Sequence, residues 1–181
     1  MNKYLKAQFW SFDIIFSIII FSIALTILTL TWFGINSQLS LAYGSGATVM
    51  ELQAETLAQT LMSTGYPPSW TAMVNTTNPS TWGSVSIGLA SASGSSSLST
   101  QKIYTFMSMS NYNYQALKPE LGIAYEYYVI IKSPSFNITI GSNPLLGKAL
   151  STYVVKKSVL VNGVPAIMEV IVWTSKPLAV V

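Results

Sequence analysis

The sequence contains no cysteine, no histidine and no arginine. Without cysteine there is no disulfide framework and no thiol nucleophile, and without histidine a Ser-His-Asp triad is excluded. The cysteine and histidine ligands of zinc fingers are missing as well. Proteins that bind nucleic acid usually rely on arginine and on clustered basic residues. Because the nine basic residues here are scattered lysines, we expect no nucleic-acid partner.

Charge of either sign is also scarce. Only 8 % of the 181 residues are charged, against about 25 % in an average soluble domain. Half of the residues are hydrophobic, which argues against a disordered chain. The length fits one modest domain with an appendage. This composition disfavours a cytosolic globular enzyme, and no local motif pairs a nucleophile with a base, so we expect no enzyme, no cofactor and no metal site.

A long apolar run lies near the N-terminus. No charged residue occurs between Asp13 and Glu51, and residues 14–33 read IIFSIIIFSIALTILTLTWF. A helix needs about 20 consecutive apolar residues to cross the hydrocarbon core of a bilayer, and a single spanning segment must be helical because its backbone groups find no water there. The sequence therefore predicts a transmembrane helix over residues 14–33.

The lysines in front of this run predict its orientation. Lys3 and Lys6 precede the run, so the positive-inside rule places the N-terminus in the cytoplasm and the rest of the chain outside the cell. Two alternatives stay open. The first is a cleaved secretory signal. Such signals have a shorter apolar core of about 7–15 residues, but small residues within 39–46 could form a cleavage site. A buried helix of a soluble core is the other alternative.

The residues just before the apolar run form a short motif. Lys6, Ala7 and Gln8 give a basic, a small and an amide residue, and Asp13 follows. This order resembles the class III signal of archaeal type IV pilins and their relatives. The resemblance implies that a membrane prepilin peptidase cuts between Ala7 and Gln8, so that residues 1–7 are a leader. The sequence printed here includes these residues, so we expect it to be the precursor or a form that is never cut.

The same resemblance gives Asp13 a role in assembly. In the family, an acid near the mature N-terminus meets the free amine of a neighbouring subunit, and a carboxylate among apolar helices is tolerable only when it is paired. The sequence departs from the bacterial pattern, since Ala7 replaces glycine and Asp13 falls at the sixth mature position instead of a glutamate at the fifth. A simpler alternative is that Ser11 or Asp13 caps a membrane anchor at the interface.

Several later segments resemble a group of archaeal membrane-anchored, pilin-like proteins. Together they fall between residues 6 and 132, and the resemblance implies no precise activity. The segments are Thr64-Gly65-Tyr66-Pro67-Pro68-Ser69-Trp70, Ser86-Ile87-Gly88-Leu89-Ala90, Leu98-Ser99 with Lys102, Asn111-Tyr112 with Leu117, Leu121-Gly122-Ile123 and Tyr127-Tyr128-Val129.

The remaining pattern predicts an α+β fold. Thr48 and Glu51 have capping-box spacing, and apolar residues recur at helical intervals until Gly65 and the prolines after it, which predicts an amphipathic helix over 48–63. We expect one long N-terminal helix over residues 8–63 and an extracellular α+β head over residues 64–181. In the head we expect loops over 69–84 and 91–100, helices over 99–107 and from Asn111 or Asn113 to Leu121, with Pro119 kinking or shortening the second, and strands over 125–131 and 136–140.

The clearest local signal is a hairpin. Asn162-Gly163 between two β-branched runs predicts a type I′ turn. Its two-residue loop pairs Val155 with Val170 and Lys156 with Glu169, whereas Lys157 interrupts the apolar file and is expected to snorkel at an edge. We therefore predict an antiparallel sheet of about four strands, packed on the amphipathic helix.

Polar groups in the two helices have alternative interpretations. Ser22, Thr26 and Thr29 share one face of the apolar helix, where hydroxyls either bond across to a neighbouring helix or bond back to their own backbone. Glu51 and Glu55 are one turn apart. This pair is more typical of a solvated helix face than of a cation site.

Two asparagines match the glycosylation sequon. Asn75-Thr76-Thr77 and Asn137-Ile138-Thr139 have the required pattern, which functions only outside the cytosol. Since Asn137 falls inside a predicted strand, Asn75 is the better candidate.

Together with the apolar run, the resemblance implies a structural subunit of an archaeal type IV pilus-like surface filament or of its assembly apparatus. Its expected partners are membrane lipid, a prepilin peptidase, and copies of itself or other pilin-like subunits, which it meets through the N-terminal helix. The alternative is a single-pass, membrane-anchored extracellular module that binds or adheres and never polymerises.

Overall fold

The computed structural model describes the backbone of residues 4–177 and the side chains of residues 14–32 and 49–177. By its internal contacts the chain divides between Gly44 and Ser45 into two compact units. Each unit is described by itself. The second unit, called the head below, contains the sheet and the hydrophobic core.

Helix α1 has the bounds Tyr4–Leu61, with its first part in one unit and its last part in the other. Its stretch Ile14–Trp32 has a mean hydropathy of 2.6 and is nowhere buried. By length and composition this stretch can cross a membrane, although a signal sequence near an N-terminus has the same properties. A single continuous rod over residues 8–63 stays a prediction. At its C-terminal end α1 stops at Leu61, two residues before the predicted end.

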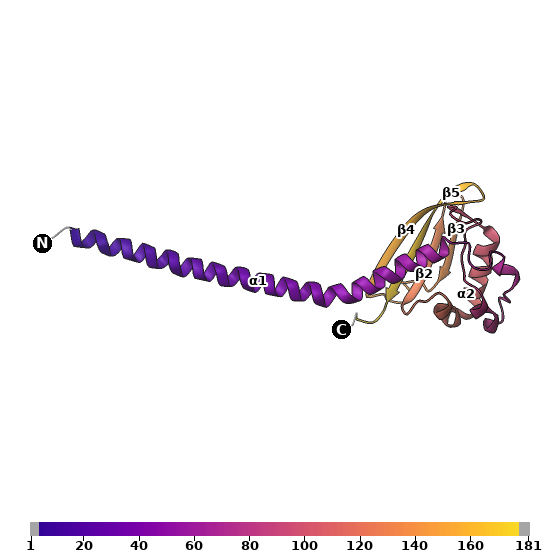
Figure 1. Cartoon of the computed structure of the whole chain (residues 1–181), viewed down its shortest axis with the longest axis horizontal. Coiled ribbons are helices and arrows are strands. Elements are labelled where there is room, and N and C mark those ends of the chain that lie inside the picture. The colour runs from indigo at the N-terminus through magenta and orange to yellow at the C-terminus, as the bar shows by residue number, and fades with distance from the viewer. Residues whose placement is uncertain (1–3, 178–181) are drawn as a thin grey trace. The chain divides into compact units, whose positions relative to one another are not determined.

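The head is α+β, as predicted, and its sheet has five strands in the order β1-β4-β5-β2-β3. Figure 1 labels four of them, β4, β5, β2 and β3. Neighbouring strands among β4, β5, β2 and β3 are antiparallel, but β1 runs parallel to β4, so the prediction of a purely antiparallel sheet was wrong. The strands are β1 (Ser97–Leu98), β2 (Glu126–Lys132), β3 (Asn137–Gly141), β4 (Ser151–Val161) and β5 (Val164–Thr174).

Strand β1 lies in the serine-rich tract that was predicted to be an exposed loop. Ser97 pairs with Leu160, and Leu98 pairs with Val161. This short strand forms because the Leu98 side chain is buried in the core, which places the backbone of Ser97 and Leu98 beside the edge of β4. A two-residue strand has no measurable period, so the sequence pattern could not reveal it.

The β4–β5 hairpin has the predicted register. Val155 lies opposite Val170 and Lys156 opposite Glu169, with 2.9 Å between Lys156 Nζ and Glu169 Oε1. Asn162 and Gly163 have φ angles of 51° and 79°, the positive values that a type I′ turn requires.

Helix α2 (Thr100–Glu120) contains the predicted break between two helices. The backbone of Asn113 is non-helical, with φ −151° and ψ 86°, and its Oδ1 atom accepts a hydrogen bond from the Ala116 amide at 3.0 Å. Asn113 therefore caps the second helical part. Ser99 occupies the N-cap position of the first part but makes no side-chain capping bond, and α2 ends one residue after Pro119.

Two short 3₁₀ helices, η1 (Trp70–Ala72) and η2 (Pro79–Ser84), occupy the segment predicted as a loop. Trp70 and Trp82 are fully buried, and their indole N–H groups donate to the Gly88 and Asn75 carbonyls at 2.9 and 2.8 Å. Single large side chains thus anchor this segment. Because these two tryptophans lack any periodic spacing, their burial could not be predicted from the sequence.

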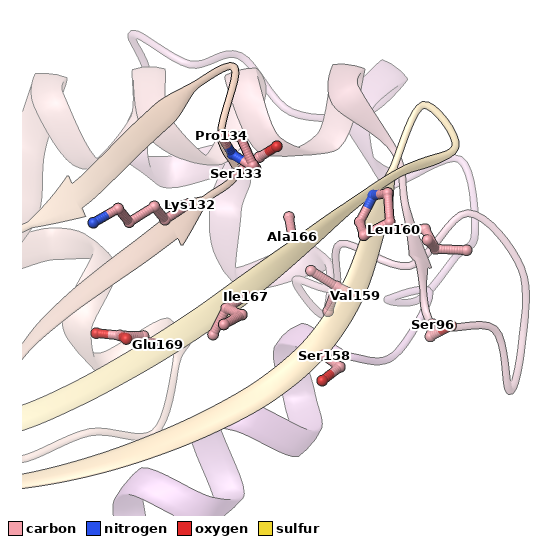
Figure 2. A pocket seen from close by; sticks show the side chains of 11 residues that line it. Ser96, Lys132, Ser133, Pro134, Ser158, Val159, Leu160, Ala166, Ile167 and Glu169 are labelled. Carbon is pink, nitrogen blue, oxygen red and sulfur yellow. The ribbon is translucent and has the colours of Figure 1, made fainter.

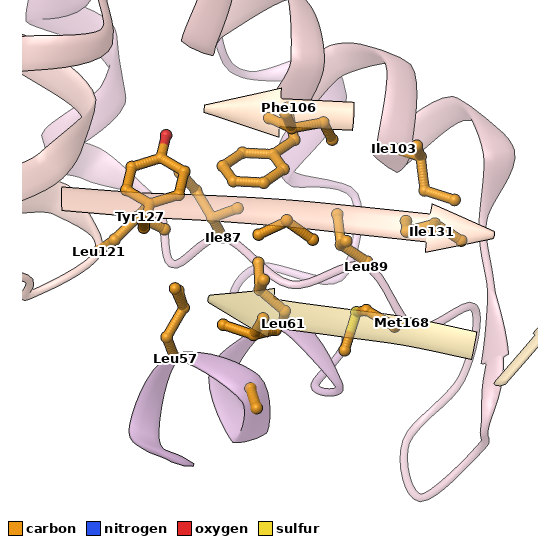
Figure 3. Packing of buried hydrophobic residues seen from close by; sticks show 14 of the residues in the cluster. Leu57, Leu61, Ile87, Leu89, Ile103, Phe106, Leu121, Tyr127, Ile131 and Met168 are labelled. Atoms are coloured by element: carbon orange, nitrogen blue, oxygen red, sulfur yellow. The ribbon is translucent and has the colours of Figure 1, made fainter. Parts of the chain in front are cut away.

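The core lies between one face of the sheet and the helices of the head. Figure 3 shows Leu57 and Leu61 of α1 and Phe106 of α2 packed against Tyr127 of β2 and Met168 of β5, and all five are fully buried. The amphipathic part of α1 therefore packs on the sheet, as predicted. This packing leaves the opposite face of the sheet open.

Candidate interaction surfaces

The apolar stretch of α1 presents its side chains outward on every side. All residues from 14 to 32 are exposed, and the large apolar ones range from 48 % for Ile15 and Ile19 to 70 % for Trp32. Each Å² of such surface gains about 25 cal/mol when it leaves water. An apolar environment would therefore stabilise this surface.

The hydroxyls on this stretch bond to their own helix. Ser22, Thr26 and Thr29 donate to the carbonyl oxygens four residues earlier at 2.7–2.8 Å. The hydroxyl hydrogens therefore have acceptors within their own helix and need no neighbouring helix, which makes this face compatible with lipid. The hydroxyl oxygens can still accept a bond, so contact with another helix stays a prediction.

The leader motif and the acid after it lie outside the described side chains. Lys6, Ala7, Gln8 and Asp13 fall within the bounds of α1, and their predicted roles in processing and assembly stay predictions.

A buried lysine joins three distant segments of the head. The side chain of Lys102 is 7 % exposed, and Nζ donates to the carbonyl oxygens of Thr64 at 2.7 Å and of Ala90 at 2.9 Å. No carboxylate within the described residues forms an ion pair with it. Burial lowers the pKa of Lys102, because the charged amine loses water.

The same segments are held together by a close approach of two glycines. A Cβ atom on Gly88 would overlap the amide nitrogen of Gly65 and the carbonyl oxygen of Ser63. Tyr66 and Ser86 also form an antiparallel bridge, with backbone bonds of 2.8 and 2.9 Å. Three of the segments that carry the second sequence resemblance, 64–70, 86–90 and the one with Lys102, therefore meet at a packed junction. They shape the head and do not form an open site.

A tyrosine pair fills the space between α2 and β2. The rings of Tyr114 and Tyr127 lie 4.9 Å apart, and the Tyr114 hydroxyl accepts from the Tyr127 amide at 2.9 Å. The Tyr127 hydroxyl lies 3.3 Å from Ser110 Oγ. Burial raises the pKa of both phenols, so both stay neutral at physiological pH. Neutral, hydrogen-bonded phenols position β2 against α2.

The two glutamates of α1 contact side chains of strand β4. Glu51 accepts a hydrogen bond from the Tyr153 hydroxyl at 2.8 Å, and Glu55 pairs with Lys157 at 3.2 Å. Glu51 is exposed and the Glu55 side chain is 40 % exposed, so both also meet solvent, as expected of a solvated helix face. Lys157, with a side chain that is 36 % exposed, makes its ion pair in this partly exposed position. In the part of the chain that the structure describes, no three metal-binding side chains gather in one place.

Both sequon asparagines are exposed. The Oδ1 atom of Asn75 accepts bonds from the amide and the hydroxyl of Thr77 at 3.0 and 2.8 Å. Asn137 begins the edge strand β3, opposite Lys132. Modification of either residue stays a prediction.

The open face of the sheet contains a groove that the sequence analysis missed. The groove has a volume of about 860 Å³, and Figure 2 shows Leu160 and Ile167 lining it beside Ser158, with Lys132 and Glu169 at one side. Leu160 and Ile167 share the face of Lys156 and Glu169 in the hairpin. Other apolar residues such as Val154 and Ile171 lie on the same face, so the alternation of the hairpin gave no signal that singles out the groove.

Comparison with protein-family models, with curated proteins and with solved structures finds no match to this chain.

Proposed function

We propose that this chain is a structural subunit of an archaeal type IV pilus-like surface filament or of its assembly apparatus. In this proposal the stretch Ile14–Trp32 holds the precursor in the cell membrane, with the N-terminus in the cytoplasm and the head outside. After processing, the same stretch packs against other subunits.

One observation carries the proposal. The chain combines a head that buries its own core with a 19-residue apolar helical stretch that is long enough to cross a membrane. Lipid and other apolar helices are the two surroundings that satisfy such a stretch, and a subunit that leaves the membrane for a filament uses both in turn. The motif from Lys6 to Asp13 adds the expected processing signal.

The first test is the N-terminus of the protein from native membranes and from sheared surface material. Mass spectrometry should find a peptide that begins at Gln8. Ala7→Phe should block this cleavage, because the resemblance requires a small residue there, whereas Leu5→Phe, the same change outside the motif, should not. An intact Met1 in surface filaments would refute processing.

The second test concerns assembly. Asp13→Ala should leave the protein in the membrane but abolish its recovery in filaments, because the neighbour's amine loses its partner. Ser11→Ala is the matched control, since it removes the other polar group that could cap an anchor. Equal loss with both variants would indicate only a capping role.

The groove on the open sheet face favours one alternative function, a membrane-anchored binding module that never polymerises. Its volume falls in the range of ligand pockets. In that case Met1 stays in place and Asp13→Ala has no effect on surface structures, whereas Ile167→Glu weakens attachment of cells to their target.

A further inference from the structure

The turn between β3 and β4 exposes two adjacent leucines. Leu145 is 87 % exposed and Leu146 is 84 % exposed, more than any other large apolar side chain of the described head. A single exposed leucine is ordinary on a protein surface. A neighbouring pair at the tip of one turn is an apolar feature that calls for a partner.

The backbone of this turn is firmly hydrogen-bonded. The Leu145 amide donates to Asn143 Oδ1 at 2.9 Å, the Gly147 amide to the Asn143 carbonyl at 3.0 Å, and the Ala149 amide to the Pro144 carbonyl at 3.0 Å. Such an asparagine-initiated turn fixes the direction of the side chains that follow. The leucines are therefore held outward by the fold.

Trp173 of β5 forms the base of the turn. Its indole N–H donates to the Ser142 carbonyl at 2.8 Å, and a Cβ atom on Gly147 would overlap its ring. Trp173 itself is buried. The turn therefore packs on the sheet through glycine and tryptophan, and its leucines contribute nothing to that packing.

The charges beside the leucines are positive. Lys148 and Lys176 are exposed, and neither forms an ion pair within the described part of the chain. Leu150 bonds to Thr174, which brings the segment of Lys176 alongside the turn. The carboxylates at this end of the sheet are engaged, Glu51 with Tyr153 and Glu126 with Lys118.

The turn lies at the end of the sheet where α1 enters the head. Tyr153, near the start of β4, contacts Glu51, and Gln53 Oε1 accepts a hydrogen bond from the Ala124 amide at 3.1 Å. Along the chain, this is the end that leads back to the apolar stretch.

We propose that the Leu145–Leu146 turn docks on the surface of the bilayer that holds Ile14–Trp32. The leucines enter the interfacial region, and Lys148 and Lys176 meet anionic lipid head groups. Apolar side chains beside basic ones bind such a surface, because the apolar area is buried in the interface and the positive charges attract anionic lipids. This inference rests on the proposed anchoring by the apolar stretch.

Docking requires a bend in the chain. An unbroken helix from Trp32 to Val49 would place the head about 25 Å from the end of the span. Gly44 and Gly46 lie in this stretch, and the division between the two units falls beside them. Each glycine weakens a helix by about 1 kcal/mol relative to alanine, so this is where the chain bends most easily.

The test uses a single label on the full-length protein in vesicles. Because the chain has no cysteine, Leu145→Cys carries a fluorophore at one site only. In phosphatidylcholine vesicles containing phosphatidylglycerol, a quencher attached to lipid head groups should reduce its emission several-fold. Ser93→Cys, in an exposed loop at the other end of β4, is the matched control and should stay unquenched.

Charge variants identify the source of the attraction. With the label at position 145, Lys148→Asn together with Lys176→Gln should lose most of the quenching that phosphatidylglycerol adds. Asparagine suits position 148 because the φ angle there is positive, at 51°. Gly44→Ala with Gly46→Ala should also reduce quenching, because the helix becomes harder to bend.

A third label separates this inference from the proposed anchoring. Ile20→Cys should be quenched by lipids that carry the quencher deep in their acyl chains. If Ile20→Cys is not quenched, the anchoring itself fails. If Ile20→Cys is quenched and Leu145→Cys is not, docking alone is overturned. A spectral change at Leu145→Cys that follows protein density, without lipid quenching, would assign the turn to a second copy and overturn lipid docking.

Discussion

The apolar stretch and the head satisfy their polar groups in opposite ways. In the stretch, the hydroxyl of Thr26 bonds to a carbonyl four residues away, and its apolar neighbours stay exposed. In the head, Lys102 bonds to Thr64, 38 residues away, and Ile131 is fully buried. The stretch takes its structure from its own backbone alone. The head, in contrast, provides its own interior.

Charged side chains in the middle of the apolar stretch should have the largest effect, because they remove the property that distinguishes the stretch from the head. Ile20→Lys with Leu25→Lys should weaken membrane insertion by about 6 kcal/mol, since each lysine costs about 3 kcal/mol at the centre of a span. Extraction of membranes at alkaline pH should then release the protein. Leu52→Lys with Val154→Lys places the same charges on exposed apolar sites of the head and should release none. Equal release by both pairs would contradict the membrane assignment.

The glycine junction should be the most sensitive point of the head. In Gly88→Ala the new methyl group meets backbone atoms of Gly65 and Ser63, which cannot move aside as a side chain does. We expect a loss of about 3 kcal/mol in the free energy of unfolding, measured by denaturant titration in detergent. Gly83→Ala is the control, because its methyl group would lie 3.5 Å from Glu120 and make ordinary contact. A loss below 0.5 kcal/mol, roughly the scatter of surface changes, would show that the junction adapts.

Alkaline pH should destabilise the head through its buried tyrosines. Burial raises the pKa of Tyr127 above the value of about 10 that it has when unfolded. The unfolded chain therefore loses this proton first, and stability is lost as pH rises above 10. At pH 11 we expect a loss of about 1.4 kcal/mol from Tyr127, with Tyr114 acting in the same direction.

The measurement is the unfolding free energy between pH 10.5 and 11.5. Below this window the lowered pKa of Lys102 has the opposite effect, because the unfolded chain then binds the extra proton. Tyr127→Phe should make the unfolding free energy fall less steeply with rising pH. Tyr104→Phe, at an exposed site on the same helix as Tyr114, should leave this slope unchanged. An unchanged slope in Tyr127→Phe would refute the burial argument.

The cross-strand ion pair of the hairpin should have the smallest effect. The side chains of Lys156 and Glu169 are 63 % and 27 % exposed, so a double-mutant cycle should give a coupling of about 0.5 kcal/mol. In the pair of Lys118 and Glu126 the lysine is only 12 % exposed while the glutamate is similarly exposed at 29 %, so the coupling of this pair should be larger. Equal couplings would mean that exposure does not govern these pairs.

Local rules allowed much of the fold to be predicted. The turn chemistry of Asn162-Gly163 determines every pairing of the hairpin, and the cap at Asn113 marks the break in α2. Both signals depend on neighbours in sequence. The burial of Trp70 and the strand at Leu98 depend on partners that lie far away along the chain, and no local pattern reports those partners.

The candidate surfaces also divide into those that depend on neighbours in sequence and those that depend on distant partners. Composition alone indicates the apolar stretch, because lipid compatibility depends on a run of neighbours. The groove around Ile167 and the exposed leucines at 145 and 146 depend on which face the tertiary structure leaves open. The partners of Glu51 and Glu55 were missed for the same reason, since they belong to a strand about one hundred residues later.

The short strand β1 leaves most of β4 without a neighbour. Only Leu160 and Val161 are paired on that side, so the backbone from Ser151 to Val159 is a free sheet edge within the described head. Free edges invite strands of other molecules to add on, and lysines discourage this addition. Lys156 and Lys157 lie in the middle of this open segment. Their charges there disfavour edge-to-edge pairing between neighbouring copies of the protein, and so disfavour aggregation.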